Sequence, residues 1–367
     1  MKILLCGGGS AGHINPGIAI AEAIKSKHND TEFLFVGREG GFENSAVEKL
    51  GIKLKTVKIE GLKRKLTFEN FKKLMLTLKA TKAAAKIIKE FQPDAVVATG
   101  GYVSWPVLRA AQKMKIPTVI HESNVFPGLV TRLISKKCSL VLLNHKETRE
   151  YLSYTKNTAV VGNPLKADFS RLSRKSSRKE MKLSENDILI VSFGGSGGAG
   201  KLNEVIAGVM KHTTSHTPGV YHIHATGKKY YTKSLSDELK SNGTGCKLLP
   251  YIDDMPKKLN AADIVICRSG AMTVSEIALV GVASILIPSP NVTDNHQYKN
   301  AKLLADNNAC ILIEEKNLTE ELLTKKLELL IKDADARKIM SEKVKKFATN
   351  DAAKTAAIEI LSKIEKK

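Results

Sequence analysis

The sequence predicts an α/β protein built from two similar domains whose parallel sheets face each other across a cleft. The chain has 367 residues, a length typical of about two domains. Short apolar runs alternate with helical patterns along the chain, as expected for parallel sheets covered by helices on both faces. A glycine-rich loop follows an apolar run once in each half, at residues 7–12 and at residues 194–200.

The apolar runs mark the strands. Short runs that are apolar throughout and bounded by turn residues are typical of strands buried on both faces. They predict strands at residues 2–6, 32–36, 95–99, 118–121 and 140–143 in the first half, and at 188–193, 220–225, 264–267 and 284–287 in the second.

The boundary between the domains is visible in the sequence. Gly162-Asn163-Pro164 ends the first half, and the polar, basic stretch 170–185 after it lacks apolar periodicity, which indicates a linker with the first turns of the next domain. We therefore expect domains at residues 1–163 and 164–350. Residues 351–367 predict a further helix, with one apolar face formed by Ala357, Ile360, Leu361 and Ile364.

The composition narrows the class of protein. No run of about 18 apolar residues occurs, so we expect no membrane-spanning helix. The five cysteines include no Cys-x-x-Cys, which argues against a disulfide framework or a zinc site. The net charge of +21 predicts an anionic partner such as a phosphorylated substrate, an anionic lipid or a nucleic acid, although the even spread of lysine also fits a lysine-rich proteome.

Both glycine loops are typical of anion-binding turns. Glycines let backbone N–H groups approach an anion, and the following helix adds the positive end of its dipole. Each loop matches Gly-x-Gly-x-x-Gly, but a dinucleotide site also needs an acid at the end of the second strand. In each half, the second predicted strand is followed by a basic residue, Arg38 or Lys228, and not by a carboxylate. NAD is therefore disfavoured, an NADP-dependent oxidoreductase stays an alternative, and each loop alone also fits a tight turn without a ligand.

Further polar residues follow the predicted strands, where ligands bind in open α/β sheets. His13 follows the first loop, before Pro16, which we place in the first helical turn; it suits a base, a phosphate ligand or a plain helix entry. Arg268 precedes a helix N-terminus and suits a diphosphate. Glu276 in that helix suits ribose hydroxyls or simply the helix dipole. Gln297 follows the strand 284–287 and suits sugar hydroxyls or a solvated turn.

Residues 61–91 combine basic and bulky apolar side chains. This pattern suits either an anionic bilayer surface or an ordinary surface helix packed by its apolar stripe. The residues that we expect at a membrane surface are Lys63, Arg64, Lys65, Phe68, Phe71, Lys72, Leu74 and Met75.

Seven motifs, in this order, make the chain resemble the MurG family, the peptidoglycan N-acetylglucosaminyltransferases of glycosyltransferase family 28, along almost its full length. They are GGSAGH at residues 8–13, GGYVS at 100–104, HESN at 121–124, GNP at 162–164, GGSGGA at 194–199, RSGAMTVSE at 268–276 and NHQ at 295–297. The resemblance implies a GT-B fold of two Rossmann-like domains. It also implies an inverting transfer of GlcNAc from UDP-GlcNAc to the C4 hydroxyl of MurNAc in undecaprenyl-pyrophosphoryl-MurNAc-pentapeptide, which converts lipid I to lipid II in peptidoglycan synthesis.

The same resemblance implies a peripheral protein at the cytoplasmic face of the cell membrane, with a role in cell-wall biogenesis, cell shape and cell division. Its implied partners are UDP-GlcNAc, the lipid I acceptor, the anionic inner-leaflet surface and a cell-wall synthesis complex, with no nucleic acid, no cofactor and no metal. Residues 1–163 would bind the acceptor and the membrane, with the helix 351–367 packed back on them. Residues 164–350 would bind UDP-GlcNAc.

The motifs also carry over residue roles. Ile252 would contact uracil, Glu276 the ribose, Ser196 with Arg268 the diphosphate, and Gln297 the GlcNAc hydroxyls. The loop at residues 10–12 and Asn124 would close the donor site from the other domain. The full donor-binding set is Ser10, Ala11, Gly12, Asn124, Lys166, Ser196, Ile252, Arg268, Ala271, Met272, Thr273, Val274, Ser275, Glu276 and Gln297.

In the implied reaction a base accepts the proton of the acceptor hydroxyl while UDP leaves. A pKa near neutrality favours a histidine, so we expect His13 as the base, with Glu122 in reserve. Arg268, Ser196 and the helix N-terminus would stabilise the charge on the leaving diphosphate.

The chain departs from the family pattern in three places. Ser10-Ala11 stands where Thr-Gly is usual, Trp105 where Gly is common, and Lys166 where Arg is common, which weakens a bidentate phosphate contact. Two rival functions stay open besides the oxidoreductase. One is a GT-B transferase with another acceptor, such as a diacylglycerol or a natural product, and the other is a non-catalytic subunit that binds a nucleotide sugar.

Overall fold

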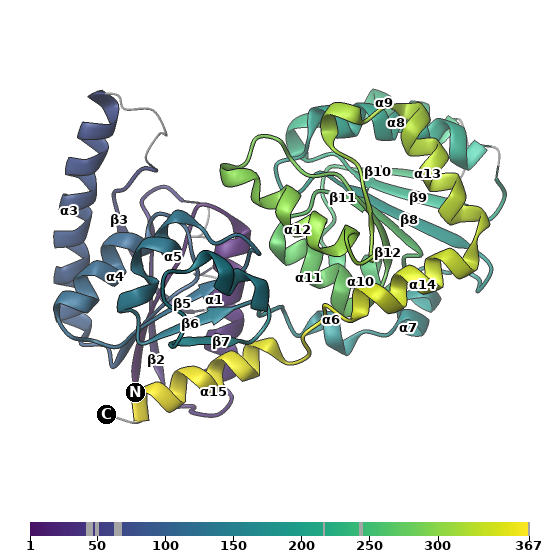
Figure 1. Cartoon of the computed structure of the whole chain (residues 1–367). Coiled ribbons are helices and arrows are strands. Elements are labelled where there is room, and N and C mark those ends of the chain that lie inside the picture. Colours follow the sequence, from purple (N-terminus) through teal and green to yellow (C-terminus); the bar gives the residue numbers. More distant parts are fainter. Residues whose placement is uncertain (42–46, 48–50, 62–67, 216, 242–244, 366–367) are drawn as a thin grey trace. The chain divides into compact units, whose positions relative to one another are not determined.

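The computed structural model describes residues 1–41, 47, 51–61, 68–215, 217–241 and 245–365 (Figure 1). The chain forms two compact units. Unit 1 comprises Met1–Lys166 and Asp351–Lys367, and unit 2 comprises Ala167–Asn350. Each unit contains one parallel sheet with helices on its faces, so the predicted α/β class with two Rossmann-like domains is confirmed.

The sheet of unit 1 has seven parallel strands. Side chains alternate between its faces, so Leu4 and Cys6 pack towards α3 and α4 while Ile3 and Leu5 pack towards α1 and α15. In spatial order the strands are β3 (Lys53–Val57), β2 (Glu32–Arg38), β1 (Lys2–Cys6), β4 (Ala95–Ala98), β5 (Thr118–Glu122), β6 (Leu140–Leu143) and β7 (Thr158–Val160). The helices are α1 (Ala11–Lys25), α3 (Phe68–Phe91), α4 (Ser104–Lys113), α5 (Leu129–Ile134), η1 (Ser135–Lys137), η2 (Lys146–Tyr151) and α15 (Ala352–Glu365).

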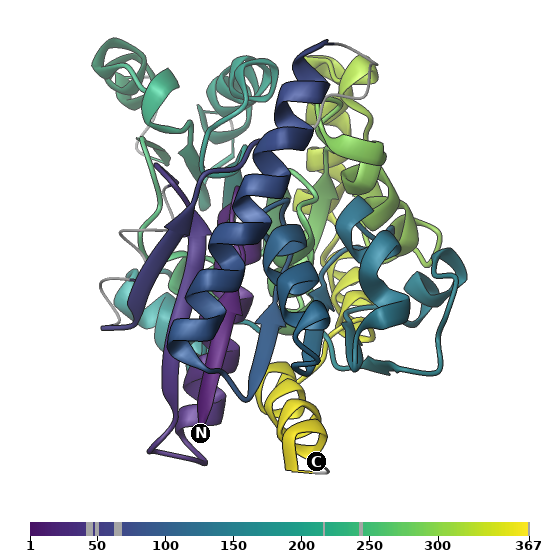
Figure 2. The ribbon, with the colours of Figure 1, turned by 90° about the vertical axis from the view of Figure 1, so that its left-hand side faces the viewer.

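The long helix α3 covers one face of this sheet together with α4 (Figure 2). Ala84 and Ile88 on its inner side are buried in the core. Its other side exposes Leu74, Met75 and Leu78, which are 51%, 46% and 54% accessible. The described part of α3 is therefore amphipathic, yet it leaves a second apolar stripe uncovered.

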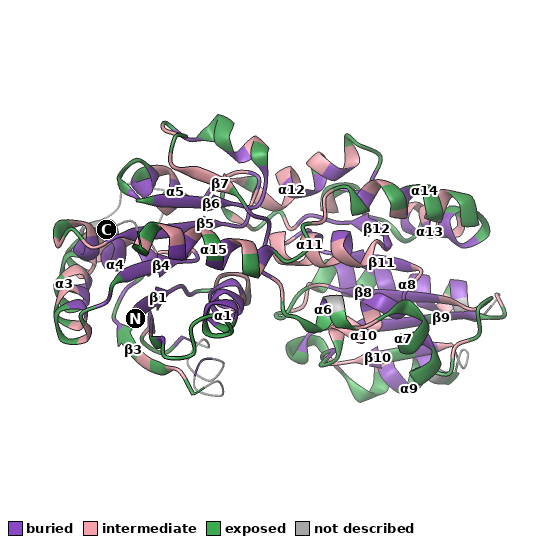
Figure 3. Ribbon diagram, turned by 90° about the horizontal axis from the view of Figure 1, so that it is seen from below, coloured by how far each residue is buried: buried purple, intermediate pink, exposed green. Residues whose placement is uncertain are grey.

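The sheet of unit 2 has six parallel strands, whose buried residues form the purple centre of the unit in Figure 3. In spatial order they are β10 (Cys246–Leu249), β9 (Val220–Ala225), β8 (Ile188–Phe193), β11 (Ile264–Cys267), β12 (Ala283–Leu286) and β13 (Ile311–Leu312). The helices are α6 (Asp168–Arg171), α7 (Arg174–Glu180), α8 (Gly200–Ser215), η3 (Lys228–Tyr230), α9 (Lys233–Ser241), α10 (Met255–Ala261), α11 (Ala271–Val280), η4 (Thr293–Asn295), α12 (His296–Ala305), η5 (Glu315–Asn317), α13 (Glu320–Lys332) and α14 (Ala334–Lys345).

All nine predicted strands are present, with ends that differ by at most two residues. The sequence did not predict β3, β7, β10 and β13, which are the edge strands of the two sheets. Each of them alternates buried and exposed positions or is only partly buried, so none contains a continuous apolar run. The requirement for a continuous apolar run therefore identified the inner strands, which have a neighbouring strand on both sides.

The stretch 170–185 was expected to hold a linker with the first turns of the next domain; the first turns are present as α6 and α7, and the whole stretch belongs to unit 2. Its helix α7 packs against α10, and the buried Arg178 donates to Asp263 Oδ2 at 2.9 Å. The same guanidinium donates to the carbonyls of Ser184 and Asp187, both at 2.6 Å. Polar side chains that satisfy one another give no apolar periodicity, so the sequence pattern of this stretch does not distinguish a packed helix from a linker.

The predicted helix at 351–367 is confirmed as α15. Ala357, Ile360 and Leu361 are buried, and the helix packs against α1 within unit 1. The placement of Pro16 in the first turn of α1 is wrong. The helix begins at Ala11, so Pro16 lies in its second turn and cannot donate to the carbonyl of residue 12.

Candidate functional site

A polar cavity of about 300 Å³ lies in unit 2, where the glycine loop leaves β8 and the ends of β11 and β12 lie beside it. This is the edge of a parallel sheet at which α/β proteins bind ligands. The lining residues come from the loop, the start of α8, η3, the segments that follow β11 and β12, α12 and η5. They are Gly194, Gly198, Ala199, Gly200, Lys201, Tyr230, Arg268, Ser289, Asn291, Gln297 and Glu315.

The glycine loop is held by close backbone contacts. Gly198 has a φ of +74°, and a Cβ built on it would lie 2.0 Å from the carbonyl oxygen of Thr226. Gly227, with a φ of +84°, also packs against Gly198, since a Cβ built on it would lie 2.7 Å from the Cα of Gly198. The loop leads into the 16-residue helix α8 at Gly200, so the positive end of a long helix dipole points at the cavity.

A chain of buried hydrogen bonds lies beneath this loop. Asn203 Nδ2 donates to the carbonyl of Thr226 at 2.9 Å, and His224 Nε2 lies 3.2 Å from Asn203 Oδ1. Ser192 Oγ lies 2.8 Å from His224 Nδ1 and 2.7 Å from His222 Nε2. Because the carbonyl of Thr226 only accepts, Asn203 donates to it through Nδ2 and turns its Oδ1 towards His224 Nε2 as an acceptor. Thr226, whose carbonyl oxygen packs against Gly198, is therefore connected through hydrogen bonds to the buried strands β8 and β9.

Both histidines of this chain are neutral. Burial lowers the pKa of His222 to about 3, and the neighbouring His224 lowers it further. Burial also lowers the pKa of His224 to about 4. Burial removes the hydration that a charged imidazolium would need, which favours the uncharged form of both rings.

Arg268 extends from the end of β11 and is the most constrained cation of the cavity. Its Nη1 donates to the carbonyls of Ile287 and Pro288, both at 3.1 Å, and its Nη2 forms an ion pair with Glu315. The side chains of Arg268 and Glu315 are only 10% and 18% exposed. The guanidinium is therefore fixed by the backbone on one side and neutralised by a carboxylate on the other.

Gln297 lies in the first turn of α12 and is oriented by its neighbours. Its Oε1 accepts from the backbone N–H of Ser289 at 2.9 Å, and its own carbonyl accepts from Ser269 Oγ at 2.9 Å. Asp294 and Asn295 before it both adopt left-handed backbone conformations, which turn the chain sharply into α12. With its amide oxygen engaged, Gln297 presents its amide N–H group as a donor.

The first glycine loop, in unit 1, packs as closely as the second. A Cβ on Gly7 would lie 2.5 Å from Thr99 Oγ1, and one on Gly101 would lie 2.1 Å from the carbonyl oxygen of Gly8. His13, in the first turn of α1, places Nδ1 3.1 Å from the carbonyl oxygen of Thr99. The loop after β4 therefore fixes the imidazole of His13.

Glu122 is buried at the end of β5 and organises the loop that follows. Its Oε1 accepts from the backbone N–H and the Nδ2 of Asn124, both at 3.1 Å. Its Oε2 accepts from Gly128 N at 2.8 Å and from Thr131 Oγ1 at 2.6 Å. Both oxygens are occupied by donors, so this carboxylate serves the loop, and His13 is the better placed of the two expected bases.

The other expected site residues are spread over both units. Arg268 and Gln297 line the cavity together with the second glycine loop, whereas Ser196 is exposed on that loop outside the lining. Buried Ile252 follows β10. Unit 1 contains Ser10 as the N-cap of α1, the first α1 residues Ala11 and Gly12, Asn124 after β5 and the exposed Lys166, and α11 contains Ala271, Met272, Thr273, Val274, Ser275 and Glu276.

Of the expected membrane residues, Leu74 and Met75 are exposed on α3. Lys63, Arg64 and Lys65 lie outside the described residues, as do the side chains of Phe68, Phe71 and Lys72. Within the described part of the chain, no helix is both long and apolar enough to span a bilayer.

Sequence reasoning missed Lys201, Tyr230 and Glu315. Lys201 follows the last glycine of the loop directly, a spacing that is a usable signal for a phosphate site. Tyr230 packs on the loop, with its ring 2.8 Å from a Cβ built on Gly198. Glu315 lies on a short turn after the unpredicted strand β13, and nothing in its local sequence indicates that it contacts Arg268.

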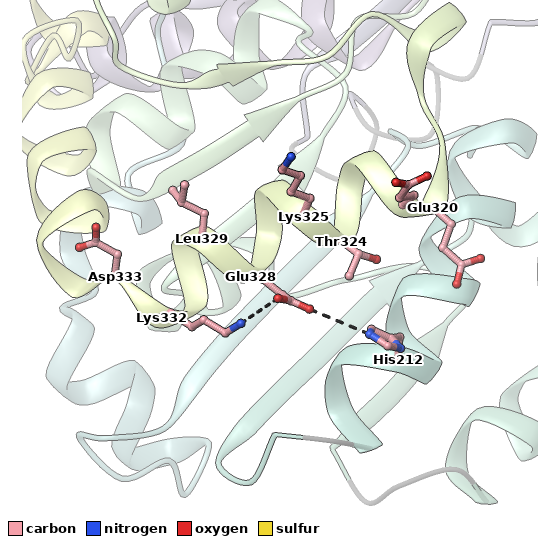
Figure 4. Close-up of a pocket in the computed structure, with 9 residues that line it drawn as sticks. His212, Glu320, Thr324, Lys325, Glu328, Leu329, Lys332 and Asp333 are labelled. Carbon is pink, nitrogen blue, oxygen red and sulfur yellow. Dashed lines mark hydrogen bonds and ion pairs between the residues drawn. The ribbon is translucent and has the colours of Figure 1, made fainter.

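A second, open depression of about 870 Å³ lies between α8 and α13 (Figure 4). Glu328 lies at its centre, 2.8 Å from Lys332 and 4.0 Å from His212. Its lining mixes both charges on helix surfaces, away from the strand ends. The lining residues are His212, Glu320, Glu321, Thr324, Lys325, Glu328, Leu329, Lys332 and Asp333.

Two parallel-sheet Rossmann-like units, with a polar cavity at the glycine loop of the second, are the architecture of the GT-B class of proteins. The chain belongs to glycosyltransferase family 28, since the N-terminal domain model of that family matches residues 3–143 and its C-terminal domain model matches residues 189–356. The predicted family is thus confirmed.

Curated relatives cover the whole chain. A protein of Acetivibrio thermocellus is 40% identical over 352 residues, covering 96% of this chain and 95% of its own length. One of Bacillus subtilis is 38% identical over 355 residues, covering 96% and 97%. Both are called UDP-N-acetylglucosamine--N-acetylmuramyl-(pentapeptide) pyrophosphoryl-undecaprenol N-acetylglucosamine transferase. The crystal structure of Acinetobacter baumannii MurG is similar with a TM-score of 0.76 at 26% identity, covering 100% of this chain and 99% of that one.

Proposed function

We propose that this protein is an inverting glycosyltransferase of peptidoglycan synthesis. It transfers GlcNAc from UDP-GlcNAc to the C4 hydroxyl of MurNAc in undecaprenyl-pyrophosphoryl-MurNAc-pentapeptide, converting lipid I to lipid II. The observation that carries the proposal is the 40% identity with a transferase of this name over 96% of the chain. The identity extends through both units, so the donor-binding and the acceptor-binding parts are both included.

Unit 2 is the donor-binding unit in this proposal. The amides at the start of α8, Lys201 and Arg268 line one cavity and suit the diphosphate of UDP-GlcNAc. Gln297 offers an amide donor to the sugar hydroxyls in the same cavity. Ile252 for uracil and Glu276 for ribose stay predictions from the family motif.

The reaction is a single displacement. The acceptor C4 oxygen attacks the anomeric carbon of GlcNAc, the bond from that carbon to the diphosphate oxygen breaks, and the configuration inverts. The proton of the hydroxyl passes to His13, and UDP leaves with the bonding electron pair. Backbone N–H groups and the helix dipole at the second glycine loop stabilise the negative charge that develops on the leaving group.

Unit 1 is the acceptor-binding and membrane-associated unit in this proposal. Leu74, Met75 and Leu78 are exposed on α3, and exposed lysines, among them Lys79 and Lys82, lie on the same helix. Apolar side chains beside lysines suit peripheral binding to the anionic cytoplasmic face of the cell membrane, where the lipid acceptor would lie.

The decisive experiment is turnover of radiolabelled UDP-GlcNAc by the purified chain with a short-chain lipid I analogue. We expect formation of the disaccharide product, and none when the acceptor is left out or replaced by diacylglycerol. Product with diacylglycerol but not with the lipid I analogue would favour the rival acceptor. No turnover with any acceptor, despite binding of UDP-GlcNAc, would favour a non-catalytic subunit.

A further inference from the structure

The cavity contains a carboxylate in the place where an anionic ligand would bind. Glu315 pairs with Nη2 of Arg268, the guanidinium nitrogen that makes no bond to the backbone carbonyls. Among the described residues that line the cavity, Lys201 and Arg268 are the cations and Glu315 is the one anion. With Glu315 in place, the lining carries one net positive charge for a diphosphate that brings about two negative ones.

Arg268 has backbone partners besides Glu315. Two carbonyl oxygens, of Ile287 and Pro288, accept from Nη1 at 3.1 Å each, and both belong to the segment that leaves the buried strand β12. These contacts hold the guanidinium plane. Glu315 itself lies on η5, a turn of three residues after the short edge strand β13. The carboxylate is therefore the partner that has more freedom to move away.

We propose that Glu315 is an internal competitor of the diphosphate: its carboxylate occupies the anion-binding side of Arg268 and must be displaced when a nucleotide diphosphate binds. In the empty cavity Glu315 supplies the counter-ion that a nearly buried guanidinium needs. The carboxylate competes for Arg268 while the product is bound, which shortens the lifetime of the bound product, and it pairs with Arg268 again once the product has left. Glu315 thus lowers the affinity for UDP and accelerates its release. This inference rests on the proposed function, because it takes the ligand to be a nucleoside diphosphate.

The test compares Glu315→Gln with Glu314→Gln in the full chain by calorimetry. The first substitution removes the charge that faces Arg268. The second removes the same charge one residue earlier, where Glu314 pairs with Lys316 at 3.2 Å and its side chain is 42% exposed. We expect Glu315→Gln to lower the Kd for UDP by about five- to tenfold and to slow UDP dissociation, while Glu314→Gln changes the Kd by less than about twofold.

Uridine and inorganic pyrophosphate separate the possible causes. Uridine has no phosphate, so its Kd is expected to be equal in the wild type and in Glu315→Gln, which also verifies that the variant is folded. Pyrophosphate is expected to bind more tightly to Glu315→Gln, whatever nucleoside the site accepts. Weaker or unchanged binding of UDP and pyrophosphate by Glu315→Gln would overturn the inference. If the wild type and the variant both bind pyrophosphate but not UDP, the proposed function fails. The difference between their Kd values for pyrophosphate then still tests whether Glu315 competes with the anion.

Discussion

The imidazole Nδ1 of His13 lies 3.1 Å from the carbonyl oxygen of Thr99, and Thr99 Oγ1 in turn donates to the carbonyl of His13. A carbonyl oxygen only accepts, so Nδ1 bears the proton of the neutral ring. The lone pair is then on Nε2, which is the arrangement that a general base requires. A contact between the first turn of α1 and the loop after β4, 86 residues apart in the sequence, thus selects one tautomer of His13.

Replacing His13 tests this role. We expect His13→Ala to reduce turnover by about a hundredfold, because a positioned base contributes about 10²- to 10⁴-fold. The KM for UDP-GlcNAc is expected to change little, since the donor cavity lies in unit 2. His28→Ala, on an exposed turn after α1, is the matched control. A loss of less than about tenfold, or about 1.4 kcal/mol of barrier, would remove His13 from the role.

Two neighbouring glycines of the second loop separate backbone strain from simple loss of a glycine. Gly198→Ala places a methyl group 2.0 Å from the carbonyl oxygen of Thr226 at a φ of +74°, whereas a Cβ on Gly197 meets nothing within 4 Å. We expect Gly198→Ala to lose about 1–3 kcal/mol of stability and at least about tenfold in UDP affinity. Gly197→Ala should keep both within about 0.5 kcal/mol. Equal effects of the two substitutions would contradict the close-packing argument.

Membrane binding is expected to depend on the exposed stripe of α3. The double variant Leu74→Gln, Leu78→Gln should bind vesicles of phosphatidylglycerol about tenfold more weakly, because it removes two apolar side chains from the proposed contact. Ile358→Gln is the control, since Ile358 is equally exposed on α15 of the same unit. Vesicle flotation measures the effect. Undiminished flotation of the double variant would exclude this stripe as the docking surface.

The buried histidines of unit 2 predict a loss of stability in acid. His222 and His224 bind protons in the unfolded chain below about pH 6.5, but in the folded chain only near their lowered pKa values of about 3 and about 4. The unfolded state therefore binds more protons in this window, and the free energy of unfolding falls as the pH falls from about 6.5 to about 4. The contribution is on the order of 3 kcal/mol for each residue.

Urea unfolding between pH 7 and pH 4 measures this slope. His222→Asn should make the slope shallower, while His28→Asn on the surface should leave it as in the wild type. Buried His121 and His145, whose pKa values are also lowered by burial, add to the slope in both variants. A slope that is unaffected by His222→Asn would mean that this ring is not neutral in the folded protein.

The sequence predicted the interior of both sheets because an internal strand of a parallel sheet has neighbours on both sides and must be apolar throughout. It failed at the four edge strands for the same reason. In β3, for example, Lys53 and Lys55 are exposed beside the buried Val57, a pattern that does not differ from a polar loop.

The sequence predicted those residues of the site that lie in a short motif following a predicted strand. The second glycine loop, Arg268 and Gln297 each follow a predicted strand, and the structure brings them to one cavity. The partner of Arg268 was not predictable, because Glu315 is 47 residues away and reaches the cavity through an edge strand that sequence patterning cannot detect. A contact between residues that only tertiary folding brings together has no signal in the sequence around either residue.

The return of α15 to unit 1 has a consequence for biosynthesis. The apolar side of α1 is covered by α15, whose residues are synthesised more than 300 positions later, after all of unit 2 has been translated. Pairings at such separations are slow to form, so a nascent chain would carry an uncovered patch on its first helix while its second unit is already able to collapse. The first unit to begin would be the last to be completed, and chaperone capture during translation would be expected at that patch.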